Sequence, residues 1–399
     1  MNKLINFAYR AIEKFSINIV TITHKKKIAD NTSDNILIIY LHHLGDIVNF
    51  TDALVAIKET SKKQISLVTF TSNKEYLENT YDKSGVRLNR DINVLYLREH
   101  PHVNEYLTLI KNINKINYEL VLVPIWFGIN CKVAYCAGTK ELWTADLHFR
   151  KGILNFFDNI YLKKATIVKE ISDKIWIQNL FSIAVRDIFD KNYRSNISEI
   201  SIDSQPEDIK NFVVISPGSK SGAPRCWGER KYAQITEYLI KKYDLNVVIV
   251  GTKNERSIGE NILNNVSDET AQRIYNEAGE TDYKGLANLL VNSEFVISND
   301  SGTAHLATAL GTRAVVILAK HMLGYNFPYD PEMSNDRPLP ICVYSEKTYP
   351  CERCGFHGDG IPGIMPDGKS CIGKDGTFRC IDEIAVSDVE KKIDCIMNE

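Results

Sequence analysis

The residues best suited to chemistry lie in one stretch near the C-terminal third of the chain, FVISNDSGTAHLATALGTRAVVIL, residues 295–318. It reads as a buried strand (295–298), a polar turn (299–303), a helix of small residues (304–310) and a second strand (314–318). In open parallel sheets, ligands bind where the carboxyl end of a strand meets the N-terminus of a helix. The turn is therefore a candidate ligand site.

The turn carries groups that bind anions. Asp300 opens it, Ser301 and Thr303 can cap the helix and donate hydrogen bonds, and Gly302 allows the backbone to approach a ligand closely. Free N–H groups at the helix N-terminus would receive an anion such as a diphosphate. His305 lies one turn further and adds a donor. From the residues alone, an ordinary capped turn is an equally good interpretation.

A second candidate loop, PGSKSGAPRCW at 217–227, follows the apolar strand 212–216. The guanidinium of Arg225 can bind a diphosphate bidentately. Taken alone, Arg225 is more simply a solvated loop charge. Its position beside Gly218 and Ser219, at the carboxyl end of a strand, favours anion binding. The next strand also ends in a glycine, Gly251.

A third loop, HHLGD at 42–46, lies between the buried strand 36–41 and a helix at 47–59. Asp46 follows a glycine there, so we expect its carboxylate to project from the carboxyl edge of the N-terminal sheet. The simple alternative is that Asp46 only caps its helix.

These three loops resemble motifs of the ADP-heptose:lipopolysaccharide heptosyltransferases, glycosyltransferase family 9. D-S-G-T-x-H-L-A-x-A-L-G-T, at 300–312, resembles the nucleotide-sugar diphosphate motif of that family, 217–227 resembles P-G-x…[K/R]-x-W, and 36–59 resembles the opening strand, x-x-L-G-D and helix. The resemblance implies that Asp46 is the general base. It implies that the donor is bound by Gly218, Ser219, Arg225, Gly251, Asp300, Ser301, Gly302, Thr303 and His305.

The chain departs from the family pattern at two places. Cys226 stands where relatives often have Arg, so one basic contact is missing unless Lys220 replaces it. His42 and His43 stand where Ser is common, and they are the reserve candidates for the base. A helix N-terminus lowers the pKa of an aspartate, which weakens Asp46 as a base unless desolvation raises that pKa again.

The reaction implied by the resemblance is inverting glycosyl transfer from a nucleotide-diphosphate sugar, with ADP-heptose as the leading donor, to a lipopolysaccharide-type glycan. Such a reaction needs a base near the acceptor hydroxyl and positive potential around the leaving diphosphate. No Asp-x-Asp metal motif occurs, so we expect no catalytic metal. The alternatives are heptosyl transfer to protein Ser residues, epimerisation of a nucleotide-sugar by a GT-B enzyme, or a non-catalytic sugar-nucleotide-binding scaffold.

A Gly-rich segment near the C-terminus contains the four cysteines Cys351, Cys354, Cys371 and Cys380. Thiolates in a segment with little capacity for a core predict a structural metal, zinc or iron, with His357 as a substitute ligand. The alternative is reduced thiols in a surface loop. Family members often carry cysteines here, ending in C-[M/I]-x-x-I, which residues 380–384 match, and a related group that modifies autotransporter proteins uses cysteines as an iron-binding finger.

The elements that position these loops alternate between strand and helix in both halves of the 399-residue chain, which predicts α/β domains with parallel sheets. With the resemblance, this implies the GT-B fold: two Rossmann-like domains facing each other across a cleft. We expect an amphipathic basic segment at 1–30, an acceptor-binding domain at 31–200 with a polar linker at 191–210, and a nucleotide-sugar-binding domain at 201–399. The cysteine-rich segment, 342–385, belongs to the last.

Composition sets the remaining limits. A net charge of −2 argues against nucleic-acid binding, and no apolar run reaches the ~18 residues that a membrane span needs. Nine cysteines, an odd number, suit a reducing cytoplasm. Residues 1–27 combine helical apolar spacing with basic residues, which predicts either peripheral contact with the inner membrane or a helix packed on the protein.

Overall fold

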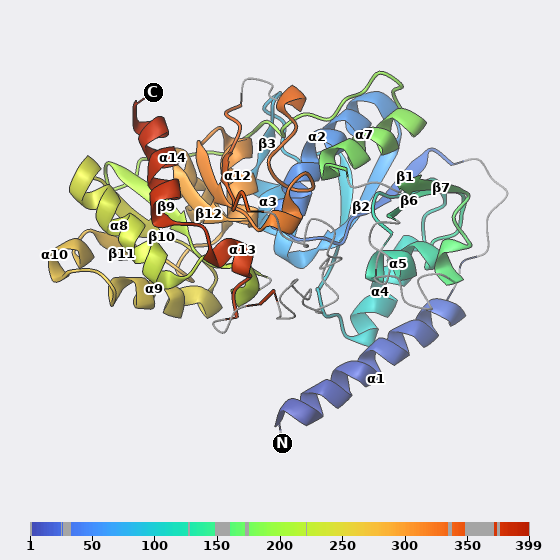
Figure 1. The fold of residues 1–399 in the computed structure, drawn as a ribbon. Coiled ribbons are helices and arrows are strands. Elements are labelled where there is room, and N and C mark those ends of the chain that lie inside the picture. The colour runs from blue at the N-terminus through green and yellow to red at the C-terminus, as the bar shows by residue number, and fades with distance from the viewer. Residues whose placement is uncertain are drawn as a thin grey trace.

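The computed structural model describes residues 2–24, 26, 33–126, 128–147, 160–171, 175–220, 222–333, 337–347, 371–372 and 376–398. They form two α/β domains, each built on a six-stranded sheet, and the two domains lie side by side (Figure 1). The predicted GT-B architecture is confirmed.

The N-terminal domain has the strand order β4-β2-β1-β5-β6-β7, with every neighbouring pair parallel. The central strands are continuous apolar runs because helices cover both faces of the sheet. The strands are β1 (Asn35–Ile39), β2 (Gln64–Phe70), β4 (Ile92–Leu97), β5 (Tyr118–Val123), β6 (Thr139–Leu147) and β7 (Ile167–Ile171). The helices are α1 (Asn2–Thr23), α2 (Leu44–Ser61), α3 (Lys74–Asn79), α4 (Val103–Ile113), α5 (Ile129–Cys136) and α7 (Ile177–Ile188). A short pair, β3 (Tyr81–Asp82) and β8 (Ile200–Ser201), is antiparallel.

The C-terminal domain repeats the same plan with the order β11-β10-β9-β12-β13-β14, again all parallel. The strands are β9 (Phe212–Ser216), β10 (Asn246–Ile249), β11 (Ile274–Asn276), β12 (Val296–Asn299), β13 (Ala314–Ile317) and β14 (Ile341–Val343). The α-helices are α8 (Glu229–Tyr243), α9 (Arg256–Leu263), α10 (Asp268–Ala271), α11 (Tyr283–Asn292), α12 (Gly302–Leu310), α13 (Arg379–Asp382) and α14 (Val386–Asn398).

In both sheets, the strands that come first and fourth along the chain are neighbours at the centre of the sheet. Such a pair is the topological switch point where open α/β sheets bind ligands. In the N-terminal domain the pair is β1 and β5, and in the C-terminal domain it is β9 and β12. The three candidate loops follow β1, β9 and β12, so all three leave a sheet at a switch point.

The strands at the edges of the sheets are hard to predict from the sequence. The sequence favours a single helix from 171 to 189, but this is wrong at its start, because Ile171 ends strand β7 and α7 begins at Ile177. Strand β7 lies at the sheet edge with Ile167 41% and Val168 37% exposed, so it lacks the buried apolar run of a central strand. Strands β11 and β14 are also edge strands, and each is only three residues long, so neither forms a long apolar run.

The two domains meet where the first turns of α2 and α12 touch. A Cβ atom built on Gly45 would lie 2.9 Å from Cδ2 of His305 and 3.0 Å from Cα of Gly302. A Cβ built on Gly302 would lie 3.1 Å from the Gly45 nitrogen. A side chain at either position would require the facing atoms, most of them backbone, to move away, so the present closeness of the domains depends on glycine at both positions.

Other contacts hold the domains in this relation at a distance from the glycine pair. Tyr283 of α11 forms a hydrogen bond to Thr80 through its hydroxyl, and its N–H donates to Glu75 at 3.0 Å. The Trp176 indole donates to the carbonyl of Pro328 at 2.7 Å. The junction is therefore built from several small contacts on both sides of the glycine pair.

We predict that Gly45→Ala separates the domains and lowers the free energy of unfolding by about 1–3 kcal/mol, the usual cost of overpacking. Alanine normally stabilises a helix by up to about 1 kcal/mol relative to glycine. Gly285→Ala in α11 is the matched control, because its Cβ would meet neighbours no closer than 3.4 Å. Urea unfolding and small-angle scattering measure the two effects. A Gly45→Ala protein as stable and as compact as Gly285→Ala would contradict the prediction.

Candidate active site

The helix α12 places its N-terminus at the junction of the domains. Ser301 is its N-cap residue, but the Ser301 side chain makes no capping bond and instead lies 2.8 Å from the Ser298 hydroxyl. The Thr303 hydroxyl accepts from Ser216 at 3.2 Å. The expected side-chain cap at Ser301 is therefore wrong, because β12 supplies a closer partner. The first amides of α12 remain available to an anion.

The loop 217–227 is fixed to β12 by one buried amide. Asn299 donates through Nδ2 to the carbonyl oxygens of Pro217 at 2.6 Å and Gly218 at 3.2 Å. Its Oδ1 accepts from the Trp227 amide at 3.3 Å and the Tyr232 hydroxyl at 3.0 Å. Asn299 is fully buried. One side chain thus ties both ends of the loop to the strand that carries the diphosphate motif.

Arg225 and Asp300 are brought together as the sequence predicted. An Arg225 Nη1 atom lies 3.5 Å from Asp300 Oδ2, and Nη2 lies 3.6 Å from the Met322 sulfur. The Asp300 side chain is 5% exposed and that of Arg225 22%. The guanidinium thus lies beside Asp300, two residues before α12 begins.

Glu255 was not predicted, yet it lies over two of the predicted glycines. A Cβ on Gly218 would fall 2.1 Å from Glu255 Oε1, and one on Gly251 would fall 3.2 Å from Oε2. The carboxylate accepts from the Thr252 amide at 2.7 Å and its hydroxyl at 2.8 Å. Glycine at 218 is thus explained by the carboxylate beside it. The signal in the sequence was a strand-end glycine followed four residues later by an acid.

Asp46 is the third residue of α2 and lies across the junction from the diphosphate motif. Its Oδ2 accepts from the His43 amide at 3.2 Å, and His42 Nδ1 lies 4.0 Å from the same atom. The Asp46 side chain is 35% exposed. Asp46 therefore does cap its helix, and its second oxygen, Oδ1, has no capping role. An asparagine in its place could make the same capping bond.

His305 occupies the interface rather than an exposed surface. It is 3% exposed, its ring stacks on Phe327 with centroids 4.2 Å apart, and Nδ1 lies within hydrogen-bond distance of the Tyr329 hydroxyl. Tyr329 donates to Asn49 of α2 at 3.2 Å, so Nδ1–H of His305 is the donor to Tyr329. Burial lowers the pKa of His305 to about 4, although the negative charges of Asp300 and Asp46 act to raise it. His305 is thus a neutral imidazole that joins α12 to α2.

A second bridge joins the loop 217–227 to the N-terminal domain. Lys220 donates to Glu99 at 2.6 Å and to Nδ1 of His43 at 2.8 Å. His43 stacks on Phe70, and burial together with the Lys220 charge lowers its pKa. Burial opposes ionisation of Glu99, yet the hydrogen bond from Lys220 leaves the Glu99 pKa below its usual value. Lys220 could replace the missing basic contact of the donor site, and His43 is a reserve candidate for the base. This bridge bonds the two residues to each other.

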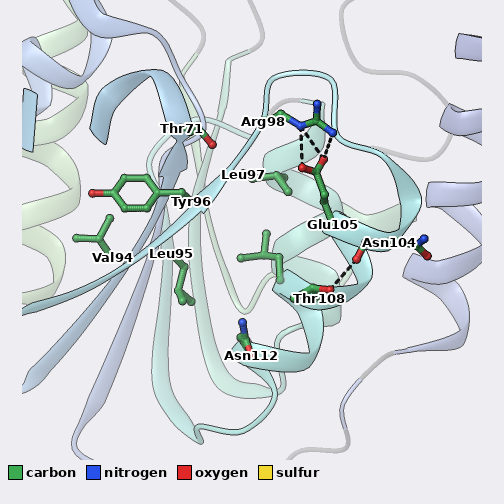
Figure 2. Close-up of a pocket in the computed structure, with 11 residues that line it drawn as sticks. Thr71, Val94, Leu95, Tyr96, Leu97, Arg98, Asn104, Glu105, Thr108 and Asn112 are labelled. Atoms are coloured by element: carbon green, nitrogen blue, oxygen red, sulfur yellow. Dashed lines mark hydrogen bonds and ion pairs between the residues drawn. The ribbon is translucent and has the colours of Figure 1, made fainter. Parts of the chain in front are cut away.

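The described residues also form a pocket of about 410 Å³ in the N-terminal domain, between β4 and α4 (Figure 2). Arg98 and Glu105 face each other on its wall and form a bidentate ion pair, with N–O distances of 2.7 Å. Their charges therefore satisfy each other. The pocket lies apart from the diphosphate motif and shares no lining residue with it.

The cysteine prediction falls mostly outside the described residues, which include neither Cys351 nor Cys354. Cys371 and Cys380 are buried and come close through their backbones, since the Arg379 amide donates to the Cys371 carbonyl. Among the described residues no three metal-ligand side chains gather. The Phe378 amide donates to the Pro224 carbonyl at 3.0 Å, so this segment packs directly on the loop that carries Arg225.

The candidate site therefore gathers most of the predicted residues at one junction. Four further residues, Asn299, Glu255, Tyr329 and Asn49, hold or complete it. Glu255 left a local signal in the sequence. The link from Tyr329 to Asn49 did not, because it joins residues 280 apart.

Comparisons with known proteins point to one enzyme family. Residues 159–338 match the model of glycosyltransferase family 9 (heptosyltransferase). The chain is 32% identical over 99 residues to lipooligosaccharide heptosyltransferase 2 of Haemophilus ducreyi, covering 25% of this chain and 28% of that protein. It is 29% identical over 159 residues to the enzyme of the same name from Haemophilus influenzae, covering 39% and 44%. The matched segments thus span less than half of these relatives.

A solved structure extends the likeness to the whole fold. The Escherichia coli ADP-heptose lps heptosyltransferase II superposes with a TM-score of 0.62 over 91% of this chain and 98% of that chain, at 14% identity. At that identity the agreement establishes the fold.

We predict that His305 makes the protein less stable in acid. Its folded pKa of about 4 lies below the usual 6.5, so the unfolded chain binds the proton first and stability falls as pH drops from about 6.5 to about 4. The loss attributable to His305 is about 3 kcal/mol. Urea unfolding of wild type and His305→Gln gives the free energy of unfolding at each pH in this range. The slope of this free energy against pH should be steeper for wild type. Carboxylates common to both proteins do not contribute to the difference between the two slopes.

A second measurement covers the case in which His305→Gln fails to fold. In the wild-type protein, the ring resonances of His305 should not titrate near pH 6.5. Titration there, or equal slopes for the two proteins, would contradict the prediction.

Proposed function

We propose, from the premise that this chain belongs to glycosyltransferase family 9, that it transfers a heptose from ADP-heptose to the core of lipopolysaccharide with inversion. Support comes from its similarity to proteins named as heptosyltransferases and from one geometric observation. The helix N-termini of α2 and α12, one from each domain, meet at Gly45 and Gly302. A carboxylate, Asp46, lies on one side of this junction and the basic residue Arg225 on the other.

The donor diphosphate would bind at the start of α12. The uncapped first amides of that helix, the positive end of its dipole and Arg225 all offer positive potential to an anion. The start of α2 adds a second helix N-terminus at the same place. These fixed dipoles would stabilise negative charge as the nucleoside diphosphate departs.

The nucleoside would lie along the carboxyl ends of β9 and β10. Glu255 presents a carboxylate there, over Gly218 and beside Gly251. A carboxylate accepts from two neighbouring hydroxyls, which is what a ribose offers. Asn299 keeps the loop 217–227 in the position that leaves this surface open.

Asp46 would act as the base. The acceptor hydroxyl attacks the anomeric carbon, the bond from that carbon to the diphosphate oxygen breaks, and its electron pair leaves with the diphosphate. The hydroxyl proton passes to Asp46 Oδ1, because Oδ2 is held by the His43 amide. Closure around the substrates would remove water from the carboxylate and from the reacting hydroxyl.

No catalytic metal is part of this proposal, because the helix amides and Arg225 occupy the role that a metal has at an Asp-x-Asp motif. A structural zinc or iron bound by Cys351, Cys354, Cys371 and Cys380 remains a separate proposal. Its support is the burial of Cys371 and Cys380, and the hydrogen bond from the Phe378 amide to the Pro224 carbonyl would let such a metal brace the loop that carries Arg225.

The acceptor implies a location. The core of lipopolysaccharide is anchored in a membrane, so we include in the proposal that the enzyme works at the inner face of the inner membrane, in peripheral contact through residues 1–27.

We predict that Arg225→Ala weakens donor binding by about 1.5–3 kcal/mol, the range for a hydrogen bond to a charged group. Calorimetry with ADP or ADP-heptose measures the change. Arg230→Ala is the matched control, because Arg230 is an exposed arginine five residues away in α8. Equal affinity in the two variants would remove Arg225 from the donor site.

We predict that Asp46→Asn lowers kcat by about 10²–10⁴-fold, the contribution of a general base, with donor affinity nearly unchanged. Asparagine keeps the capping bond to the His43 amide, so stability should not change. The assay is run in excess EDTA, which should leave wild-type turnover unaffected. Near-wild-type turnover in Asp46→Asn would show that Asp46 only caps its helix, and His42 would be the next residue to test.

A further inference from the structure

The helix α1 presents two different faces. Its inner face is seated on α4 and α5 of the N-terminal domain. Ile17 is 5% exposed, and buried Thr21 lies 2.9 Å from the Tyr106 hydroxyl. Glu13 lies 3.3 Å from His102 at the start of α4. These contacts fix the helix on the domain, while its N-terminal end extends away from the body of the protein (Figure 1).

The outer face carries an apolar stripe of Phe15, Ile19 and Ile22, which are 63%, 48% and 54% exposed. Their spacing of four and three residues places them on one side of the helix, opposite Ile17. We call these three residues the α1 stripe. They are the three most exposed of the large hydrophobic residues in the described part of the chain. An apolar surface gathered in this way indicates a binding face.

The segment of the sequence that contains the stripe has a net charge opposite in sign to that of the rest of the chain. Residues 1–27 contain six basic residues and one acidic residue, Glu13, which gives +5. The whole chain carries −2, so the remainder carries −7. The basic residues are Lys3, Arg10, Lys14, Lys25, Lys26 and Lys27. Among the described helices that are long enough, none is apolar enough to cross a bilayer.

We propose that the α1 stripe lies in the headgroup region of an anionic phospholipid bilayer, with basic residues of the same segment contacting lipid phosphates. An apolar stripe accompanied by lysine and arginine is the chemistry of an interfacial helix. A second copy of the chain fits less well, because pairing two stripes would bring two segments of +5 together. This inference rests on the proposed function for its biological setting and specifies the surface that meets the membrane.

The consequence of the contacts with α4 and α5 is that a bilayer on the stripe would hold the N-terminal domain, which carries Asp46, at the membrane. The donor-binding domain would remain the part that moves relative to the lipid. A membrane-anchored acceptor would thus be presented to Asp46 without leaving the bilayer.

The test is sedimentation of the full chain with vesicles. We expect binding to vesicles of phosphatidylglycerol and phosphatidylethanolamine, little binding to phosphatidylcholine alone, and loss of binding at high salt. Changing Phe15, Ile19 and Ile22 together to Gln should weaken binding roughly tenfold or more. Lys14→Gln should weaken it roughly fivefold. A double variant of exposed residues in the C-terminal domain, Tyr275→Gln with Val291→Gln, is the matched control and should bind like wild type.

Vesicle binding by the triple variant equal to that of wild type would overturn the proposal. Loss of a dimer in the triple variant, measured by sedimentation equilibrium, together with no vesicle binding by wild type, would assign the stripe to a second copy instead. The proposed function is tested separately with a delipidated acceptor in solution, on which the triple variant should keep wild-type turnover. No transfer by either protein, with vesicle binding intact, would reject the function and retain the membrane surface.

Discussion

The close approach of Gly45 and Gly302 is the constraint on which the rest of the site depends. A Cβ atom at either position would lie about 3 Å from the facing helix, so the two helices approach each other through glycine backbone. Their N-termini therefore point at one region, and the groups that follow them in sequence, Asp46 and His305, come to lie on either side of it. Partial positive charge from two helices at one place favours an anion more than either helix alone.

Around this contact, polar side chains secure positions that a hydrophobic core could not define. Asn299 holds the loop that carries Arg225, Asp300 orients Arg225, and Tyr329 links His305 to Asn49 across the domain boundary. These groups are buried and their hydrogen bonds are satisfied, which makes each of them costly to misplace. The junction combines these polar contacts with apolar ones, such as the stacking of His305 on Phe327.

Much of this arrangement could be predicted from the sequence, for reasons that are physical. Strands β9, β12 and β13 are apolar runs bounded by turns, because they are buried on both faces, and their ends locate the loops that carry function. Edge strands such as β7 have no such pattern. Contacts between domains leave no local pattern at all, since Lys220 and Glu99 lie 121 residues apart and Tyr329 and Asn49 lie 280 apart. Glycine at position 45 was readable as part of a motif, but its cause is a partner in the other domain.

Asn299 also bears on how this protein would age. Both ends of its amide are used, Nδ2 by two carbonyl oxygens and Oδ1 by two donors. Deamidation would replace the nitrogen with an oxygen and set that oxygen against the carbonyls of Pro217 and Gly218. The loop would be released while the sheet behind it stayed folded. Deamidation at this one position would thus disturb the loop that carries Arg225 before it disturbed the sheet.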